Sequence, residues 1–298
     1  MSQRFSVKPK KAELAKSHNA LLPALINGDQ LSAIRIVEDA IALRWEPSIV
    51  YVNMIGHCLA EIGAMWHSGK LSIATEHRAT QIALRLLSRS QASYADGRRI
   101  GRIGRKVIIA SVQGDNHIIG GLTYADLLRF EGWDVDFLGA DTPVESLVDL
   151  VTQERPNLVG LSVTIEDFIP NAVQTVTAIK KIPNPPVVVI GGAAATITDI
   201  PEADFCSADA VATVKWTQSH FNLDESSVTL EVMLHELGDR IQTLRKDRGL
   251  SQQDLARDAG LDRSYISAVE HGKQNVSFAT LKGISDALAV PVATLIAG

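Results

Sequence analysis

The chain has 298 residues, of which 46% are hydrophobic and 21% charged, a globular composition that allows two or three domains and is unlike that of a disordered chain. No unbroken apolar run approaches the roughly 20 residues that span a bilayer, and no apolar segment follows the polar N-terminus, so we expect a cytoplasmic protein without a membrane partner. The two cysteines, Cys58 and Cys206, lie in different segments, which argues against a disulfide framework or a cysteine-bound metal.

Residues 11–94 form the first predicted domain. Their apolar side chains recur at three- and four-residue spacing, with breaks at positions 27–29, 46–48 and 68–70. This pattern predicts four helices that pack into a bundle. The Gly- and Arg-rich residues 95–106 then predict a linker.

Residues 106–215 form the second predicted domain, in which short apolar runs alternate with helical stretches. The runs lie at 107–110, 135–138, 158–161 and 187–190, and a short last strand is expected near 209–211. Near-continuous apolar strands suit a parallel sheet that is buried on both faces. We therefore expect a doubly wound, flavodoxin-like α/β domain.

Residues 216–230 are polar and aperiodic and predict a second linker. The helical period then returns in short segments, so residues 231–298 form a third, all-helical domain. The chain is thus expected to be a multidomain protein with a four-helix bundle, a parallel α/β domain and a small C-terminal helical domain.

The end of the first predicted strand carries Asp115, His117 and Gly120. Ligands of doubly wound sheets bind beyond the carboxyl ends of the strands. Imidazole is a common metal ligand, and its second nitrogen usually donates to a carboxylate such as Asp115. Gly120 would let a bulky group approach the backbone. The alternative is an ordinary strand-to-helix turn with an Asp cap and a surface His.

Two further strand ends fall at the same edge of the sheet. The third strand ends at Ser162-Val163-Thr164, and the fourth ends at Gly191-Gly192. Small residues there leave a slot, and the hydroxyl groups offer hydrogen bonds to a polar ligand tail.

Together these motifs resemble the cobalamin-binding domain of methionine synthase, corrinoid methyl carriers and adenosylcobalamin-dependent mutases, over about residues 106–214. The resemblance implies that His117 is the lower cobalt ligand and Asp115 its partner. It also implies that Ser162 contacts the displaced dimethylbenzimidazole tail, and that Gly191 and Gly192 line the tunnel for it. The family pattern after the third strand is S-x-L, whereas this chain has S-x-T, with Thr164 at the third position.

The helical bundle carries Trp66, then nine residues, then Glu76-His77. An indole can cover an organic upper ligand of cobalt, although a lone Trp is more often a core residue. The spacing resembles the cap of the CarH-type photoreceptors. That resemblance implies that Trp66, Glu76 and His77 cover the adenosyl group of adenosylcobalamin. It also implies that His67 binds cobalt once light has broken the cobalt–carbon bond.

Residues 234–296 resemble the helix-turn-helix domain of the phage-repressor (XRE) family. The matching segments are 250–256, 259–261 and 263–273, with Ser251 and Asp262 placed to cap two helices. Leu255, Ala256, Ile266 and Val269 should form the small core. In such domains the second helix of the pair enters the major groove. The candidate base-reading residues are Arg263, Ser264, Tyr265 and Ser267, and the candidate phosphate contacts are Gln252, Gln253, Lys273 and Asn275.

The net charge of −5, and the nine acidic against eight basic residues after position 230, lack the basic excess that is usual in DNA-binding proteins. Affinity for DNA must therefore come from a few well-placed cations and from dimerisation. A helix-turn-helix that serves only protein contacts is the alternative.

The expected function is that of a non-enzymatic, light-responsive transcriptional regulator, a homo-oligomer that binds adenosylcobalamin and a two-fold double-stranded DNA operator. Two alternatives stay open. One is a regulator that senses cobalamin without light. The other is a corrinoid methyl carrier with an attached regulatory domain. Methylcobalamin or hydroxocobalamin is the alternative to adenosylcobalamin as the cofactor.

Overall fold

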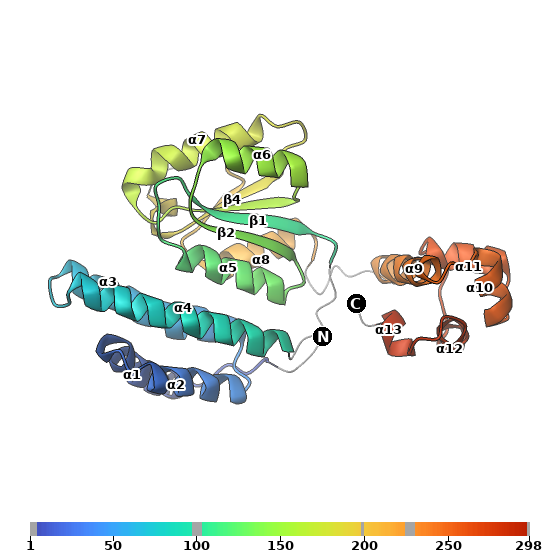
Figure 1. Cartoon of the computed structure of the whole chain (residues 1–298), viewed down its shortest axis with the longest axis horizontal. Coiled ribbons are helices and arrows are strands. Elements are labelled where there is room, and N and C mark those ends of the chain that lie inside the picture. Colours follow the sequence, from blue (N-terminus) through green and yellow to red (C-terminus); the bar gives the residue numbers. More distant parts are fainter. Residues whose placement is uncertain (1–4, 97–102, 198–199, 224–229, 297–298) are drawn as a thin grey trace. The chain divides into compact units, whose positions relative to one another are not determined.

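The computed structural model describes residues 5–96, 103–197, 200–223 and 230–296. The chain divides into two compact units, residues 1–215 and 216–298. The first unit contains a helical bundle and a five-stranded parallel α/β domain, and the second is all helical (Figure 1). The expected fold class is therefore confirmed.

The N-terminal bundle, called the cap below, begins and ends its helices at local signals in the sequence. Gly28 ends the first helix in the left-handed conformation with φ 78°, which glycine adopts without strain. The Asp29 side chain then accepts a hydrogen bond from the Ser32 amide and caps the second helix. The cap consists of α1 (Lys11–Asn27), α2 (Gln30–Ala42), the π-helical segment η1 (Ile49–Gly56), α3 (His57–His67) and α4 (Ile73–Asp96).

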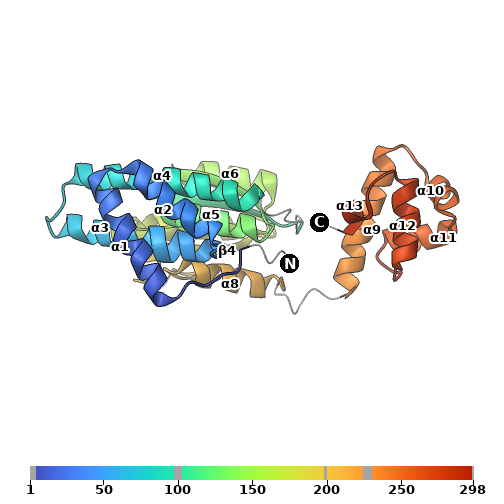
Figure 2. The same cartoon turned by 90° about the horizontal axis from the view of Figure 1, so that it is seen from below.

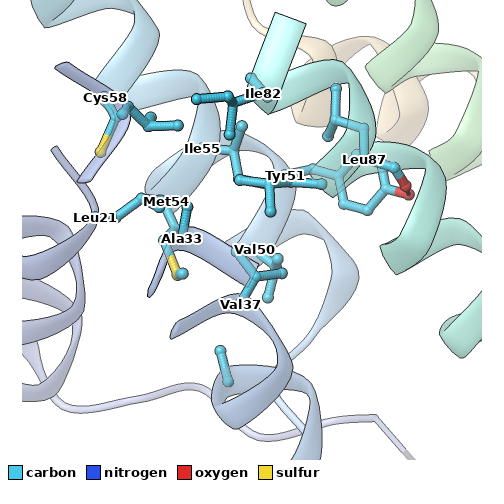
Figure 3. Packing of buried hydrophobic residues seen from close by; sticks show 14 of the residues in the cluster. Leu21, Ala33, Val37, Val50, Tyr51, Met54, Ile55, Cys58, Ile82 and Leu87 are labelled. Carbon is cyan, nitrogen blue, oxygen red and sulfur yellow. Dashed lines mark hydrogen bonds between the residues drawn. The ribbon is translucent and has the colours of Figure 1, made fainter. Parts of the chain in front are cut away.

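The continuous helix formed by η1 and α3 supplies the centre of the cap. Residues Ile49–His67 are long and apolar enough, by length and composition alone, to cross a membrane. In the fold, however, Val50, Met54, Ile55 and Cys58 lie fully buried among residues of the other cap helices (Figure 3). The apolar character of this helix is therefore explained by the core of the cap.

The α/β domain has the strand order β2-β1-β3-β4-β5, with every pair parallel. In this order β2 lies on one side of β1 and β3 lies on the other, so the topological switch lies between β1 and β3. The strands are β1 (Lys106–Val112), β2 (Asp134–Thr142), β3 (Leu158–Ser162), β4 (Val187–Gly191) and β5 (Phe205–Cys206), and the main helices are α5 (Ile119–Phe130), α6 (Val144–Glu154), α7 (Ile169–Lys180) and α8 (Ala210–His220).

Two details of this domain correct the sequence-based expectations. The last strand is Phe205–Cys206, and residues 210 and 211 begin α8 instead of forming a strand. The Asp209 carboxylate accepts hydrogen bonds from the Val211 and Ala212 amides and so caps the helix, which explains the misassignment. Because α8 continues to His220, residues 216–220 of the predicted linker are helical, and residues 224–229 lie outside the described residues.

The helices cover the two faces of the sheet in pairs. Apolar residues of α6 and α7 pack with the inner strands in one cluster. On the other face, Leu127 and Phe130 of α5 belong to the same cluster as the cap core, and Val211 and Val214 of α8 pack against it. The cap therefore lies on the α5 and α8 side of the α/β domain (Figures 1 and 2).

The C-terminal unit has its own small core. Leu255, Ala256, Ile266 and Val269 are all at most 1% exposed, as the sequence predicts. Ser251 caps α10 with its side chain, whereas Asp262 occupies the N-cap position of α11 without a side-chain hydrogen bond. The helices are α9 (Leu230–Asp247), α10 (Gln252–Ala259), α11 (Arg263–Glu270), α12 (Phe278–Ala287) and α13 (Val292–Ile296).

Candidate functional site

The loop that joins β1 to α5, residues 113–118, lies at the switch point of the sheet and is called the His117 loop below. Strand register places Ser111, Ser162 and Gly191 side by side at the carboxyl ends of β1, β3 and β4. The sequence motifs at these three strand ends therefore meet at one edge, as expected. This is the position at which doubly wound folds bind ligands.

Asp115 and His117 form a directed pair within the loop. Asp115 is fully buried, and its Oδ1 accepts hydrogen bonds from the His117 amide at 2.9 Å and from His117 Nδ1 at 2.8 Å. A carboxylate can only accept, so Nδ1 carries a proton and Nε2 is the ring nitrogen left to bind a ligand. Since the His117 side chain is 55% exposed, the pair presents an oriented imidazole at the surface of the domain.

The electrostatics of the pair favour this arrangement. Burial of Asp115 works against its ionisation, but hydrogen bonds from the His117 side chain and from the Thr164 and His117 amides outweigh burial and hold the pKa of the carboxyl below its ordinary value. The hydrogen bond to Asp115 raises the pKa of His117. The carboxylate therefore makes the imidazole more basic and a stronger electron donor.

Thr164 acts through its backbone. Its amide donates to Asp115 Oδ2 at 2.5 Å, so both oxygens of the buried carboxylate are occupied. A backbone contact of this kind does not depend on the side chain. The replacement of the family's Leu by Thr at this position is therefore compatible with the anchored carboxylate.

Ser162 and three glycines lie at the strand ends and the helix start beside this pair. The Ser162 hydroxyl is buried and has no hydrogen-bond partner among the described residues. A side chain built at Gly191 would meet nothing closer than 3.9 Å, and one at Gly120 would lie 4.0 Å from the Ser162 oxygen. Gly192 has φ +104°, and a Cβ there would come within 2.2 Å of the Val163 carbonyl oxygen. Glycine is thus required by the backbone at position 192, whereas a Cβ at Gly120 or Gly191 would make only ordinary van der Waals contact.

Glu76 is a cap residue whose charge acts on His117. It lies in the first turn of α4, its side chain is 25% exposed, and its Oε1 accepts a hydrogen bond from Thr80 at 2.8 Å. Its negative charge is one of the influences that raise the pKa of His117. The structure therefore brings these two predicted site residues, from different domains, into electrostatic contact.

The other cap residues of the motif contact one another within the cap. Trp66 is 37% exposed, and its ring lies edge-on to His67 at 4.6 Å between centroids. His67 Nδ1 donates to the Gly63 carbonyl oxygen at 3.2 Å, which leaves its Nε2 lone pair available. His77 lies 3.7 Å from the Glu76 carboxylate and is largely exposed.

The residues present fit a corrinoid. The site offers one exposed imidazole for the lower side of cobalt, and beside it glycines and a buried hydroxyl that has no partner among the described residues and could bind a polar tail. The cap adds an exposed indole, a carboxylate and a second available imidazole for the upper side.

The His117 loop has supports that the sequence analysis missed. Asn171 of α7 donates to the Gln113 carbonyl oxygen at 2.7 Å, and Asp141 accepts from the Gly114 amide at 2.7 Å. Asp141 holds a left-handed φ of 46°, an unusual conformation for a non-glycine residue. A polar residue near the carboxyl end of a strand at the ligand edge was the signal that could have identified Asp141.

In the C-terminal unit the candidate DNA-binding residues cluster around α11. Arg263 and Ser264 are exposed in its first turn. Tyr265 is half-buried, and its hydroxyl donates to the Asn275 carbonyl oxygen at 3.2 Å, which ties the loop after α11 to the helix. Ser267 is also half-buried, while Gln253, Lys273 and Asn275 are exposed.

A buried ion pair in this unit was not predicted. Arg245 Nε and Nη2 donate to the two oxygens of Glu270 at 2.5 and 3.0 Å, and Nη1 donates to the Leu250 carbonyl oxygen at 2.7 Å. Gln252 Nε2 donates to Glu270 Oε2 at 2.8 Å. The side chain of Gln252, a candidate phosphate contact, is therefore held at the start of α10 by the pair. No sequence signal links positions 245 and 270, because they meet only in the fold.

Comparison with known families agrees with this geometry. Residues 105–213 and residues 18–89 each match a B12 binding domain family, and residues 241–295 match a helix-turn-helix family. The first two matches cover the α/β domain and most of the cap, and the third covers most of the C-terminal unit.

Individual relatives show the same division. An alignment of 161 residues, 53% of this chain, is 30% identical to the HTH-type transcriptional repressor CarH of Myxococcus xanthus. It covers 52% of that protein. A second alignment, of 60 residues or 20% of this chain, is 38% identical to the immunity repressor protein of Bacillus phage phi105. It covers 42% of that protein. The chain thus spans about half the length of these curated relatives. The structure of the monomethylamine corrinoid protein of Methanosarcina barkeri superposes on 69% of this chain and 99% of its own length, with a TM-score of 0.58 and 17% sequence identity. The two proteins therefore share this fold.

Proposed function

We propose that this chain, a protein with B12 binding and helix-turn-helix domains, is a cobalamin-dependent transcriptional regulator. The observation that carries the proposal is the Asp115–His117 pair. It orients an exposed imidazole near a buried hydroxyl that has no partner among the described residues, and a carboxylate of the cap, Glu76, acts on this imidazole electrostatically. A single oriented imidazole suits the axial ligation of a cobalt that is already held by a corrin ring.

Each residue of the site has a separate task in this proposal. His117 binds the lower side of cobalt, and Asp115 fixes its tautomer. Ser162 and the glycines receive the nucleotide tail, and Thr164 holds Asp115 through its amide. The cap residues Trp66, His67, Glu76 and His77 face the upper ligand and exclude water from it.

The proposed output is DNA binding by α11 to a two-fold operator. Arg263, exposed in the first turn of α11, is suited to guanine, with Ser264, Tyr265 and Ser267 beside it. Gln252, Gln253, Lys273 and Asn275 would contact phosphates. We propose that the chain acts as a homo-oligomer in the cytoplasm and has no catalytic role. The relatives named repressors support a role in regulation by DNA binding.

We further propose that adenosylcobalamin is the physiological form and that light is the signal. When bound, adenosylcobalamin supplies a cobalt–carbon bond that light cleaves. The available Nε2 of His67, next to the exposed Trp66, supports this proposal because the imidazole can act as a ligand after a small movement of the cap.

One experiment tests both levels. The full chain is loaded with adenosylcobalamin in darkness, and its absorbance spectrum, molecular mass and binding to an operator selected from random DNA are measured before and after green light. If the chain retains cobalamin, and its affinity for DNA differs with and without cobalamin, the result supports a cobalamin-dependent regulator. A change in DNA affinity upon illumination supports the photoreceptor.

The alternatives give other outcomes of the same measurement. DNA affinity that depends on cobalamin but not on light identifies a light-independent sensor. Cobalamin binding without specific DNA binding, together with methylation of the bound corrinoid by a methyl donor and its methyltransferase, identifies a methyl carrier and contradicts the regulator.

A further inference from the structure

A buried hydroxyl connects the cap to the helix that follows the His117 loop. Tyr51 of η1 is 1% exposed, and its hydroxyl oxygen lies 3.2 Å from Asp126 Oδ2 on α5 and 3.1 Å from the Leu87 carbonyl oxygen on α4. Figure 3 shows the Tyr51 ring extending from the core of the cap toward Leu87. One phenolic hydrogen thus serves acceptors in both domains.

Asp126 is equally enclosed. It is 3% exposed, Arg129 donates to its Oδ1 at 2.7 Å, and Arg129 also donates to the Val135 carbonyl oxygen on β2 at 3.1 Å. Burial raises the pKa of Asp126, although the hydrogen bonds from Arg129 and Tyr51 oppose that rise. One oxygen of the carboxylate is therefore bound within the α/β domain, and the other is bound by the cap.

The surroundings of this contact are apolar. Leu127 and Phe130 of α5 are buried in the cap cluster, and Ile119 and Leu122 pack against it. Apolar contacts are non-directional and permit one surface to slide over the other. A buried hydrogen bond permits no sliding, because separation leaves a desolvated carboxylate oxygen without a donor.

The elements involved are also those that carry the candidate cofactor residues. Helix α5 begins at Ile119, two residues after His117, and α4 carries Glu76 in its first turn. Tyr51 contacts α4 through Leu87 and α5 through Asp126. A displacement of the cap relative to His117 must therefore stretch this contact.

We propose that Tyr51 and Asp126 form a latch that holds the cap closed over the corrinoid face, and that the cap moves only when this hydrogen bond breaks. The regulatory purpose of the latch rests on the proposed function, whereas its existence as an energetic barrier does not. Tyr51 and Asp126 are positioning residues, since they act through the cap and α5.

The test measures opening of the cap in the full chain. Leu127→Cys places a thiol inside the cap interface, and its rate of alkylation by iodoacetamide is followed by peptide mass spectrometry. Native Cys58, fully buried in the cap core, reports in the same sample whether the cap itself unfolds. In this background, Tyr51→Phe removes the hydroxyl group and keeps the ring.

The matched control is Tyr94→Phe. Tyr94 is also fully buried in the cap, and its hydroxyl donates to the Trp45 carbonyl oxygen at 3.0 Å, within the same domain. We expect Tyr51→Phe to speed alkylation at position 127 about tenfold or more, since the buried Asp126 Oδ2 loses its donor from the cap. Tyr94→Phe should leave that rate unchanged, and the Cys58 rate should be unchanged in both.

Asp126→Asn provides a second route. If the two residues act as one contact, Tyr51→Phe and Asp126→Asn together should speed alkylation no more than the stronger of the single changes. Equal rates at position 127 for Tyr51→Phe and Tyr94→Phe would overturn the latch, as would a parallel rise at Cys58 or fully additive single changes.

The measurement is made first without cobalamin and then with hydroxocobalamin bound. If the chain binds no cobalamin, the proposed function fails while the latch is still tested by the first series. If cobalamin binds and slows alkylation at position 127, but Tyr51→Phe does not change the rate in either series, the latch fails and the proposed function stands.

Discussion

Asp115 and Glu270 are buried carboxylates with nitrogen partners, one in each compact unit, and they differ in what they leave exposed. Asp115 in the α/β domain orients His117, whose ring remains 55% exposed with Nε2 available. Glu270 in the C-terminal unit binds Arg245, whose side chain is only 10% exposed and whose remaining contact is a backbone carbonyl. The first pair presents an imidazole at the surface, whereas the second is enclosed in the core of its unit.

The contrast separates function from stability among residues of similar chemistry. Orienting an exposed imidazole on a buried carboxylate costs free energy of folding and adds little packing. Its presence therefore indicates a binding role. A fully enclosed ion pair is costly to break, because removal of one partner leaves the other charge buried. Substitutions in the two pairs should therefore change different measured quantities.

The largest expected effect is on the closed pair. Glu270→Gln leaves Arg245 without a counter-charge and weakens the hold on Gln252. We expect the C-terminal unit to lose about 3–5 kcal/mol of stability, measured by urea unfolding of the full chain with DNA binding as the probe. Cobalamin binding should be unchanged. A loss below about 1 kcal/mol would show that the pair is not a structural charge centre.

The pH dependence of the same unit sharpens this prediction. Burial of Glu270 works against its ionisation, but the hydrogen bonds from Arg245 and Gln252 dominate and lower its pKa. Because the folded-state pKa lies below the unfolded value, the stabilisation is complete above the unfolded pKa and is lost as pH falls through the folded pKa. Glu270→Gln should remove that part of the acid sensitivity. Parallel acid curves for the two proteins would contradict the assignment.

The open pair should affect the cofactor. His117→Ala removes the lower ligand, and Asp115→Asn disturbs the partner that orients it. We expect Asp115→Asn to weaken cobalamin retention about 10–100-fold, with a larger loss for His117→Ala. Equilibrium dialysis and the absorbance spectrum measure the result. An unchanged spectrum in His117→Ala would remove the ligand assignment.

The DNA-contacting residues should divide by role. Arg263→Ala should reduce discrimination between operator and mutated operator by about 1–3 kcal/mol if Arg263 contacts guanine. Lys273→Ala should weaken all sequences equally and lower the salt dependence of binding. Electrophoretic mobility shifts at two salt concentrations measure both. If neither change alters binding, α11 does not contact DNA.

The smallest dark-state effect is expected at His67. His67→Ala should bind adenosylcobalamin in darkness and respond to light as the unchanged protein does, because His67 contacts only the Gly63 carbonyl and Trp66 among the described residues. After light, its spectrum should differ and its lit conformation should decay sooner. Identical spectra after illumination would exclude His67 as a ligand and leave cobalamin binding intact.

Part of this protein could be predicted from local sequence. The change of apolar period from helix to strand and back determined the fold class. The motif around His117 indicated its carboxylate partner, because residues two positions apart in a tight turn meet regardless of the rest of the fold. The capping of α10 by Ser251 followed for the same reason. The prediction of a short strand near position 209 was wrong, because the Asp209 side chain caps a helix there and this interaction overrides a weak apolar pattern.

The contacts between segments that are distant in the sequence were decided only by the tertiary structure. The support of the His117 loop by Asp141 and Asn171, the Arg245–Glu270 pair and the Tyr51–Asp126 hydrogen bond each join residues 25 to 75 positions apart. A buried polar side chain looks the same in sequence whatever its partner. Its partner is determined by which helices and strands pack together, and periodicity within one segment carries no information about that packing.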